Sequence, residues 1–185
     1  MDMAELERAA GLIHKRNAID RKIGAITGRP VVAGHLGEWI AAQIFEIGLE
    51  ASAVAKALDG HFTVGPLAGK TVNIKWYGMR EGLLDMVDDP AVDYYLVMTG
   101  PPASAGSSRG GTRPLAIDAV YLFEALALLA HLRARGVQIG IATSLTRGLW
   151  DAAECYPSPH NPALRLTSDQ HRALALFSTR HTAST

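Results

Sequence analysis

The stretch DGHFTVGPLAGKTVNIKWY, residues 59–77, decides the fold that we expect for this chain. Its second half, residues 71–76, alternates between apolar and polar side chains, which is typical of a β-strand with one face against a core. The apolar face of this strand carries Val72, Ile74 and Trp76. Asn73 and Lys75 share the opposite face, so the sequence places an amide and a cation side by side on the sheet.

A turn precedes this strand. Residues 65–69, GPLAG, combine glycine and proline, the residue types that reverse the direction of a chain. The segment that follows Asp59 is therefore predicted to fold back as a hairpin against residues 71–76. This hairpin brings the carboxylate of Asp59 near Asn73 and Lys75.

A helix is predicted before the hairpin, from about Gly34 to Gly48, with its polar residues along one stripe. Glu38 lies away from that stripe, on the side of the helix that faces protein. A buried carboxylate without a partner is costly, so Glu38 should meet a cation, a hydrogen-bond donor or a metal ion. The alternative, which gives Glu38 no functional role, is a salt bridge or a capping contact.

The remaining elements predict an α/β fold with a mixed central sheet flanked by helices, built in the order helix, three-strand meander, crossover helix and fourth strand. A long loop over residues 101–114 follows the third strand. The other predicted elements are an N-terminal helix to about Thr27, a buried strand over 92–99, a crossover helix over 119–135, a parallel strand over 137–143, and a terminal helix opened by a Thr167–Gln170 capping box.

The length of 185 residues predicts a single domain that buries a core without disulfides. We expect its core over about residues 34–143 and helical extensions over 1–30 and 144–185. The one cysteine, Cys155, cannot form an internal disulfide and is expected to be a structural thiol. The acidic opening of the chain lacks an apolar signal core, and the longest apolar run is too short to cross a bilayer. The sequence therefore predicts a soluble, cytoplasmic protein that does not interact with membranes.

The overall charge is balanced, with 18 lysines and arginines against 18 aspartates and glutamates. No global positive field indicates a nonspecific DNA coat protein, so binding of nucleic acid would depend on a local patch.

The order of helix, hairpin, strand, helix and strand resembles the core of the PD-(D/E)XK restriction-endonuclease-like superfamily, over roughly residues 34–143. Glu38 is similar in position to the glutamate often found in the first core helix of that family, and Asp59 to its motif aspartate. The tripeptide Asn73-Ile74-Lys75 falls where the family has an acidic residue, any residue and lysine. Asn73 departs from this pattern, because the family usually places Asp or Glu there.

The resemblance implies a divalent-metal-dependent nuclease that hydrolyses phosphodiester bonds, with DNA as the expected substrate and Mg²⁺ or Mn²⁺ as the expected cofactor. It assigns Asp59, Asn73 and Glu38 as metal ligands, and it assigns Lys75 to the catalytic water. Such an ion neutralises charge on the scissile phosphate and makes a bound water nucleophilic. An amide oxygen in place of a carboxylate at Asn73 should weaken Mg²⁺ binding, which puts activity in question.

Three further residues are candidates for contact with nucleic acid. His35 and His61 flank the proposed site, although a solvated or capping histidine is the alternative interpretation of each. Arg109 belongs to the loop over residues 101–114, whose serines and glycines are typical of a mobile segment. Two arginines in that loop could also close over a phosphate.

Two other hypotheses belong to different functional classes. A catalytically degenerate nuclease-fold protein, which binds nucleic acid or another protein, is favoured by Asn73 and by the balanced charge. A homodimer assembled through the N-terminal helix is suggested by the apolar residues of that helix. These residues are Ile13, Ile19, Ile23 and Ile26.

Overall fold

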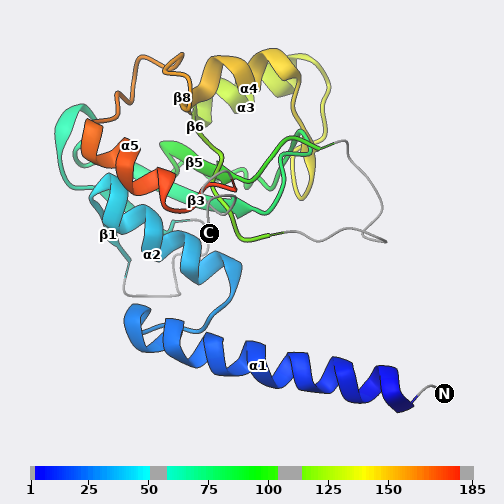
Figure 1. Ribbon diagram of the computed structural model, residues 1–185. Helices are drawn as coiled ribbons and strands as arrows, with labels where there is room; N and C mark the ends of the chain where they lie inside the picture. The colour runs from blue at the N-terminus through cyan, green and yellow to red at the C-terminus, as the bar shows by residue number, and fades with distance from the viewer. Residues whose placement is uncertain (1–2, 51–57, 104–113, 180–185) are drawn as a thin grey trace.

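The structure, a computed structural model, describes residues 3–50, 58–103 and 114–179. These residues form one central sheet with helices on both of its faces, and a long helix at the N-terminal end lies apart from the sheet (Figure 1). The predicted fold class, a mixed α/β domain, is therefore confirmed. No described helix combines the length and the apolar character that a membrane span requires.

The predicted hairpin is present. Strand β2 (Gly60–Phe62) pairs antiparallel with β3 (Thr71–Tyr77), and the short 3-10 helix η1 (Gly65–Leu67) lies in the turn between them. Gly65 and Gly69 have φ values of 71° and 79°. Glycine adopts this left-handed region without a steric penalty, which explains why the turn contains two glycines.

The central sheet has six strands in the described part of the chain, in the order β1-β2-β3-β5-β6-β8. Strands β3 and β5 run parallel, and the other neighbours in this sheet are antiparallel. The expected three-strand meander is therefore wrong at its third strand, because successive strands of a meander are antiparallel. The remaining strands are β1 (Ile47–Leu49), β5 (Tyr94–Thr99), β6 (Ala119–Glu124) and β8 (Glu154–Tyr156). A separate two-stranded sheet joins β4 (Leu83–Leu84) to β7 (Thr143–Ser144).

The helices form two layers around the sheet. Helices α2 and α5 cover one face, and α3 and α4 cover the other (Figure 1). The helices are α1 (Met3–Thr27), α2 (Ala33–Phe45), α3 (Ala125–Ala134), α4 (Arg147–Ala153) and α5 (Ser168–Ala175).

The predicted capping box at the start of α5 is confirmed. The Thr167 hydroxyl accepts from the Gln170 backbone N–H at 3.2 Å, and the Gln170 side chain accepts from the Thr167 N–H at 2.9 Å. Gln170 also donates through Nε2 to the carbonyl of Ile44, near the end of α2, at 2.9 Å. The cap therefore starts α5 and also fastens it to α2.

Strand β5 is covered on both faces, as predicted from its continuous apolar sequence. Leu96 and Met98 pack in the cluster beneath α2 and α5, whereas Tyr95 and Val97 pack in the cluster beneath α3 and α4. All four side chains are fully buried. A strand that lies between two helical layers has no need of polar alternation.

The predicted helix over residues 119–135 is wrong in its first part, because residues 119–124 form strand β6. Val120 and Leu122 belong to one hydrophobic cluster, while Tyr121 and Phe123 belong to the other. This alternation has the period of a strand, and valine, tyrosine and phenylalanine favour strands. The backbone hydrogen bonds to β5 extend along the whole of β6. They stabilise the strand more than the helical spacing of Leu122 and the later leucines favours a helix.

The predicted strand over residues 137–143 is also wrong, because only Thr143 takes part in a strand, in the small sheet with β4. Strand β6 already occupies the edge of β5 that this segment was expected to reach. Ala142 has a positive φ of 57°, and Ile141 is 90% exposed. The Thr143 hydroxyl instead closes a tight turn by donating to the carbonyl of Gly140 at 2.8 Å.

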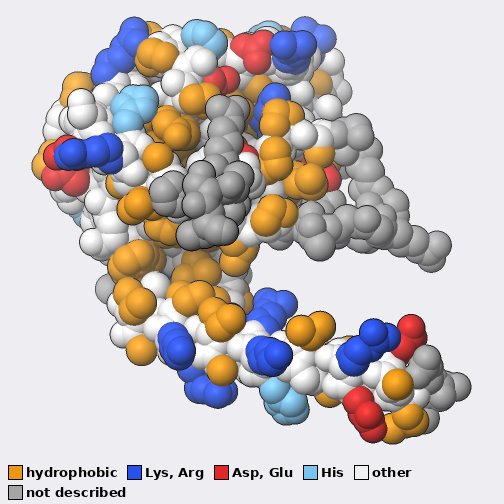
Figure 2. All heavy atoms as spheres, in the orientation of Figure 1, with side chains coloured by type: hydrophobic (Ala, Val, Ile, Leu, Met, Phe, Trp, Pro, Cys, Tyr) orange, Lys and Arg blue, Asp and Glu red, His pale blue; other side chains and the backbone are white. Residues whose placement is uncertain are grey.

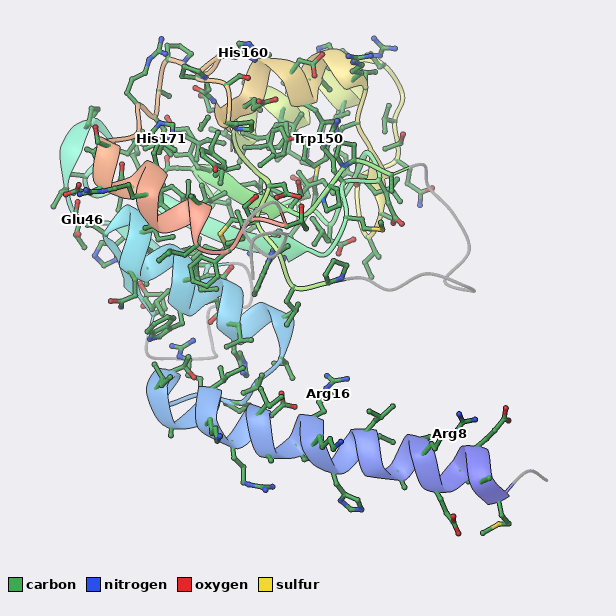
Figure 3. The ribbon with its side chains drawn as sticks, in the orientation of Figure 1. Arg8, Arg16, Glu46, Trp150, His160 and His171 are labelled. Carbon is green, nitrogen blue, oxygen red and sulfur yellow. The ribbon has the colours of Figure 1, made fainter. Side chains whose placement is uncertain are left out.

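Helix α1 ends at Thr27 as predicted, and Gly28 follows it with a φ of 67°. None of its described residues is buried. Hydrophobic and basic side chains are interspersed along its surface in Figure 2, and Arg8 and Arg16 are labelled on it in Figure 3. Ile13, Ile19 and Ile26 are exposed. Homodimerisation through this helix stays a prediction.

The Gly60→Ala substitution should destabilise the protein. A Cβ atom at this position would lie 2.4 Å from the backbone oxygen of Gly48 on the neighbouring strand, so β1 and β2 would have to move apart. We expect the free energy of unfolding to fall by about 1–3 kcal/mol, the usual cost of overpacking, as measured by urea denaturation. Gly148→Ala is the control, because a Cβ there meets nothing within 4 Å and should be neutral or stabilising in helix α4. Equal stability of Gly60→Ala and wild type would contradict the close approach of the two strands.

Candidate functional site

Asp59 is bound directly to strand β3. Its carboxylate oxygen Oδ2 accepts from the backbone N–H of Ile74 at 2.6 Å, and its own N–H donates to the carbonyl of Val72 at 3.0 Å. On its other side, the carbonyl of Asp59 accepts from the N–H of Glu50 at 3.0 Å. The carboxylate is therefore fixed beside the tripeptide that starts at Asn73, as the hairpin predicted.

The electrostatic surroundings of Asp59 raise its pKa above the ordinary value of 3.8. Burial of the carboxyl is the main cause, and the nearby carboxylate of Glu38 acts in the same direction. The hydrogen bond from Ile74 and the positive charge of Lys75 oppose this rise. Glu38 and Lys75 are thus both close enough to change the proton affinity of Asp59, although they come from a helix and a strand.

Glu38 forms an ion pair with Arg29. Nη1 of Arg29 lies 2.6 Å from Oε2 of Glu38, and the two side chains retain 31% and 23% of their exposure. Glu38 therefore meets a cation, as expected, and this contact is the salt bridge of the alternative interpretation, in which Glu38 has no functional role. Arg29 was not among the predicted site residues, although its charge, placed just before Pro30 and the start of the same helix, was a signal in the sequence.

Asn73 and Lys75 share a face of β3, as the alternation predicted. They pair in register with Tyr95 and Val97 of β5, whose side chains pack beneath α3 and α4. Asn73 is buried, with 4% of its surface exposed, whereas Lys75 is only partly buried. The lysine is therefore the more accessible of the two polar groups.

The three candidates for contact with nucleic acid have different surroundings. His61 is exposed on β2, two residues after Asp59, and its Nδ1 lies 3.9 Å from Oε1 of Glu50. His35 lies one helical turn before Glu38 on α2 and is partly buried. Arg109 lies outside the described residues.

Asp93 stabilises the start of β3 and was not singled out in the sequence. Its carboxylate accepts from the backbone N–H of Thr71 at 2.9 Å, from the hydroxyl of Thr71 at 3.0 Å, and from Nζ of Lys70 at 3.1 Å. The N–H of Thr71 is the main cause that lowers the pKa of Asp93. This contact joins the first residues of β3 to the segment that leads into β5, so it helps to set the position of Lys75.

Cys155 is fully buried, and burial raises the pKa of its thiol to about 12. The thiol therefore stays protonated at neutral pH and is a poor nucleophile. This agrees with its expected structural role.

The side chains around Asp59 include oxygen donors, the kind of ligand that Mg²⁺ binds together with the phosphates of a substrate. In residues 3–50, 58–103 and 114–179, no group of three or more His, Cys, Asp or Glu side chains forms a metal cluster. Asp59 and Glu38 supply two carboxylates, and Mg²⁺ is commonly held by one or two carboxylates together with substrate phosphates. The donor set fits that kind of site and lacks the ligands of a closed structural site.

Comparison with known proteins finds no family whose model matches this chain and no curated protein that matches it. We therefore infer the function from the geometry around Asp59.

The Asp59→Asn substitution should stabilise the protein at neutral pH. The amide oxygen can still accept from Ile74, while the half-buried charge that faces Glu38 is removed. Because the pKa of Asp59 is raised in the folded state, the folded protein binds this proton more tightly than the unfolded chain does. The unfavourable contribution of the ionised carboxyl therefore sets in as the pH rises through the folded-state pKa.

Urea denaturation at neutral and at acidic pH measures this difference. The gain in the free energy of unfolding should shrink as the pH falls. Asp88→Asn is the matched control, because Asp88 is an exposed partner of Arg133, and its effect should stay within about 0.5 kcal/mol. A stability of Asp59→Asn at or below that of wild type at neutral pH would refute the cause that we assign to the raised pKa.

Proposed function

We propose that this chain is a cytoplasmic, divalent-metal-dependent nuclease-like protein that hydrolyses phosphodiester bonds, with DNA as its substrate. The observation that carries this proposal is the hydrogen bond that holds Asp59 against Ile74, between Asn73 and Lys75. The electrostatic influence of Glu38 and Lys75 on the same carboxyl supports it.

The roles of the side chains follow from their charges and exposure. Asp59 and Glu38 would hold Mg²⁺ or Mn²⁺. Asn73 is buried on the face of β3 opposite α2, so its amide is not placed to share that ion with Glu38. A bound ion of this kind supplies Lewis-acid chemistry to the phosphate and lowers the pKa of water. Lys75 is partly exposed and positively charged, so it orients a water or offsets negative charge on the scissile phosphate.

Glu38 can take part only after its ion pair with Arg29 is exchanged for another cation. Both groups are partly exposed, and ion pairs of this kind contribute modestly to stability, so the exchange is not costly. Arg29 is then available for a phosphate oxygen, which is the acceptor that best replaces a carboxylate.

The alternative function is a nucleic-acid-binding or protein-interaction module that keeps the nuclease fold without catalysis. Two observations favour it: Asn73 is neutral and buried, and the charge of Glu38 is balanced by Arg29. Calorimetric titration with Mg²⁺ separates the two functions. Binding at millimolar concentration that is lost in Asp59→Ala favours the nuclease, and the absence of binding favours the module.

Nuclease activity should depend on Asp59 and Lys75. With plasmid and oligonucleotide substrates in Mg²⁺ or Mn²⁺, Asp59→Ala and Lys75→Ala should each lower the cleavage rate by about 100-fold or more. Lys70→Ala is the matched control, because Lys70 lies in the same hairpin and its Nζ contacts Asp93 at 3.1 Å. Equal cleavage by wild type and both site variants would refute the assigned roles.

Removal of Arg29 should strengthen metal binding. Arg29→Gln leaves the charge of Glu38 unbalanced beside Asp59, so we expect about a tenfold tighter affinity for Mg²⁺, measured by calorimetry or by the rise in Tm with added Mg²⁺. Arg16→Gln removes the same charge from exposed helix α1, where Arg16 lies 3.6 Å from Asp20, and should leave the affinity unchanged. Weaker binding in Arg29→Gln would exclude Glu38 as a ligand.

A further inference from the structure

A pocket of about 470 Å³ lies beyond the carboxyl ends of β3 and β5. Arg80, three residues after β3, lines one side of it, and Pro102 and Ala103, which follow β5, line another. The described lining is completed by Glu81, Gly82, Leu145 and two residues of α4, Arg147 and Trp150. Strands β3 and β5 form the parallel pair of the sheet, and ligands of open α/β sheets bind preferentially beyond the carboxyl ends of such strands.

Arg80 is held in this position by its backbone. Its N–H donates to the carbonyl of Pro101 at 3.0 Å, and its carbonyl accepts from the N–H of Ala103 at 2.9 Å. Its Nε atom is buried and donates no hydrogen bond to any residue that the structure describes. The backbone is therefore fixed, while the guanidinium keeps a buried donor that has no acceptor in the described part of the chain.

Trp150 also lines this pocket and carries a second buried donor. The residue is 1% exposed, and its Nε1–H has no acceptor within the described ranges of the chain. Edge-on contacts with Tyr121 and Phe123, at 4.8 Å and 5.2 Å between ring centroids, hold the ring on the side of α4 that faces the sheet (Figure 3). By contrast, Nε1 of Trp76 donates to the carbonyl of Ala116 at 2.9 Å.

Buried donors without acceptors are uncommon in folded proteins, because each one loses its hydrogen bond to water. Arg80 also lies near Tyr121, since its charge opposes the rise that burial causes in the pKa of Tyr121. Arg80 and Trp150, which both line the pocket, therefore both lie near Tyr121. Arg80 and Trp150 thus each carry a buried N–H donor for which the described residues provide no acceptor.

The charge of the lining indicates what that acceptor is. Arg147 adds a second guanidinium at the start of α4, with a side chain that is 88% exposed and 3.5 Å from the carboxylate of Asp151. Glu81 is the acidic member of the described lining, so two arginines leave a net charge of plus one. Guanidinium groups bind phosphate oxygens through paired, charge-assisted hydrogen bonds.

We propose that this pocket binds a phosphate group, which accepts hydrogen bonds from Arg80, Arg147 and the indole N–H of Trp150. The proposal does not rest on nuclease chemistry, because none of these residues belongs to the group around Asp59. The phosphate belongs either to a nucleic acid or to a free inorganic ion. The two sources share the same chemistry and are distinguished by the ligands used in the test.

The indole N–H resonances of ¹⁵N-labelled protein provide a direct test. Titration with inorganic phosphate should move the resonance of Trp150, which a Trp150→Phe variant identifies by its disappearance. The resonance of Trp76 is the internal control, because its N–H already has an acceptor. A Trp150 resonance that stays unmoved by millimolar phosphate and by both oligonucleotides described next would overturn the proposal.

Two single-stranded oligonucleotides, with and without a 5′-phosphate, identify the source. A shift with both shows that backbone phosphates bind, and a shift with the phosphorylated strand alone shows that a terminal phosphate binds. A shift with inorganic phosphate alone shows that a free ion is the ligand. Each of these three results supports a phosphate pocket.

Matched arginine variants test which charges take part. Arg147→Gln should not disturb the fold, because the side chain is exposed. Arg80→Gln tests the buried donor. Each should weaken phosphate binding by about tenfold. Arg133→Gln removes the same charge from a surface pair with Asp88 and should leave the affinity unchanged. An equal loss of phosphate affinity in Arg133→Gln and Arg147→Gln would show that only the overall charge matters. It would contradict binding in this pocket.

Discussion

The hydrogen bond from the N–H of Ile74 to the carboxylate of Asp59 is the constraint on which the candidate site depends. It takes the place of a backbone hydrogen bond just before β2 begins, so a side chain extends the ladder beyond the first residue of that strand. Because one carboxylate oxygen is used in this way, the whole carboxyl group is fixed beside β3. The proton affinity of Asp59 then responds to Glu38 from one helical layer and to Lys75 from the sheet.

This arrangement requires three elements that are far apart in the sequence to keep a fixed register. Helix α2 supplies Glu38, and the parallel pairing of β3 with β5 sets the position of Lys75 opposite Val97. A slip of one residue would turn Lys75 toward α2 and would place Ile74 on the polar face. The contacts of Asp93 with Thr71 oppose such a slip, because they join the first residue of β3 to the entry of β5.

Much of the site could be predicted from the sequence, because it depends on short-range patterns. The period of two in residues 71–76 placed Asn73 and Lys75 on one face, and the glycines of the turn predicted the hairpin that brings Asp59 to them. Segments whose pattern fits both the helical period and the strand period were harder to assign from the sequence. Residues 119–124 include Leu122, the first of the leucines at helical spacing, and they also show an alternation suited to a strand. Only the availability of β5 as a partner decides between these two structures. Arg29 was missed for a related reason. The chain turns at Pro30, between Arg29 and the helix that carries Glu38, and no periodic pattern in the sequence predicts their contact. Arg80 and Trp150 likewise come to line the same pocket only in the folded protein.

The two outermost strands of the central sheet, β1 and β8, contain three residues each. A β-sheet grows by adding a chain along an exposed edge, and a long flat edge invites association with other molecules. Here each edge offers only a short row of unpaired backbone groups, and β8 is followed at once by Pro157, which has no N–H to donate. The fold therefore protects itself against edge-to-edge aggregation at both sides of the sheet, and it does so without charged side chains on a long edge strand.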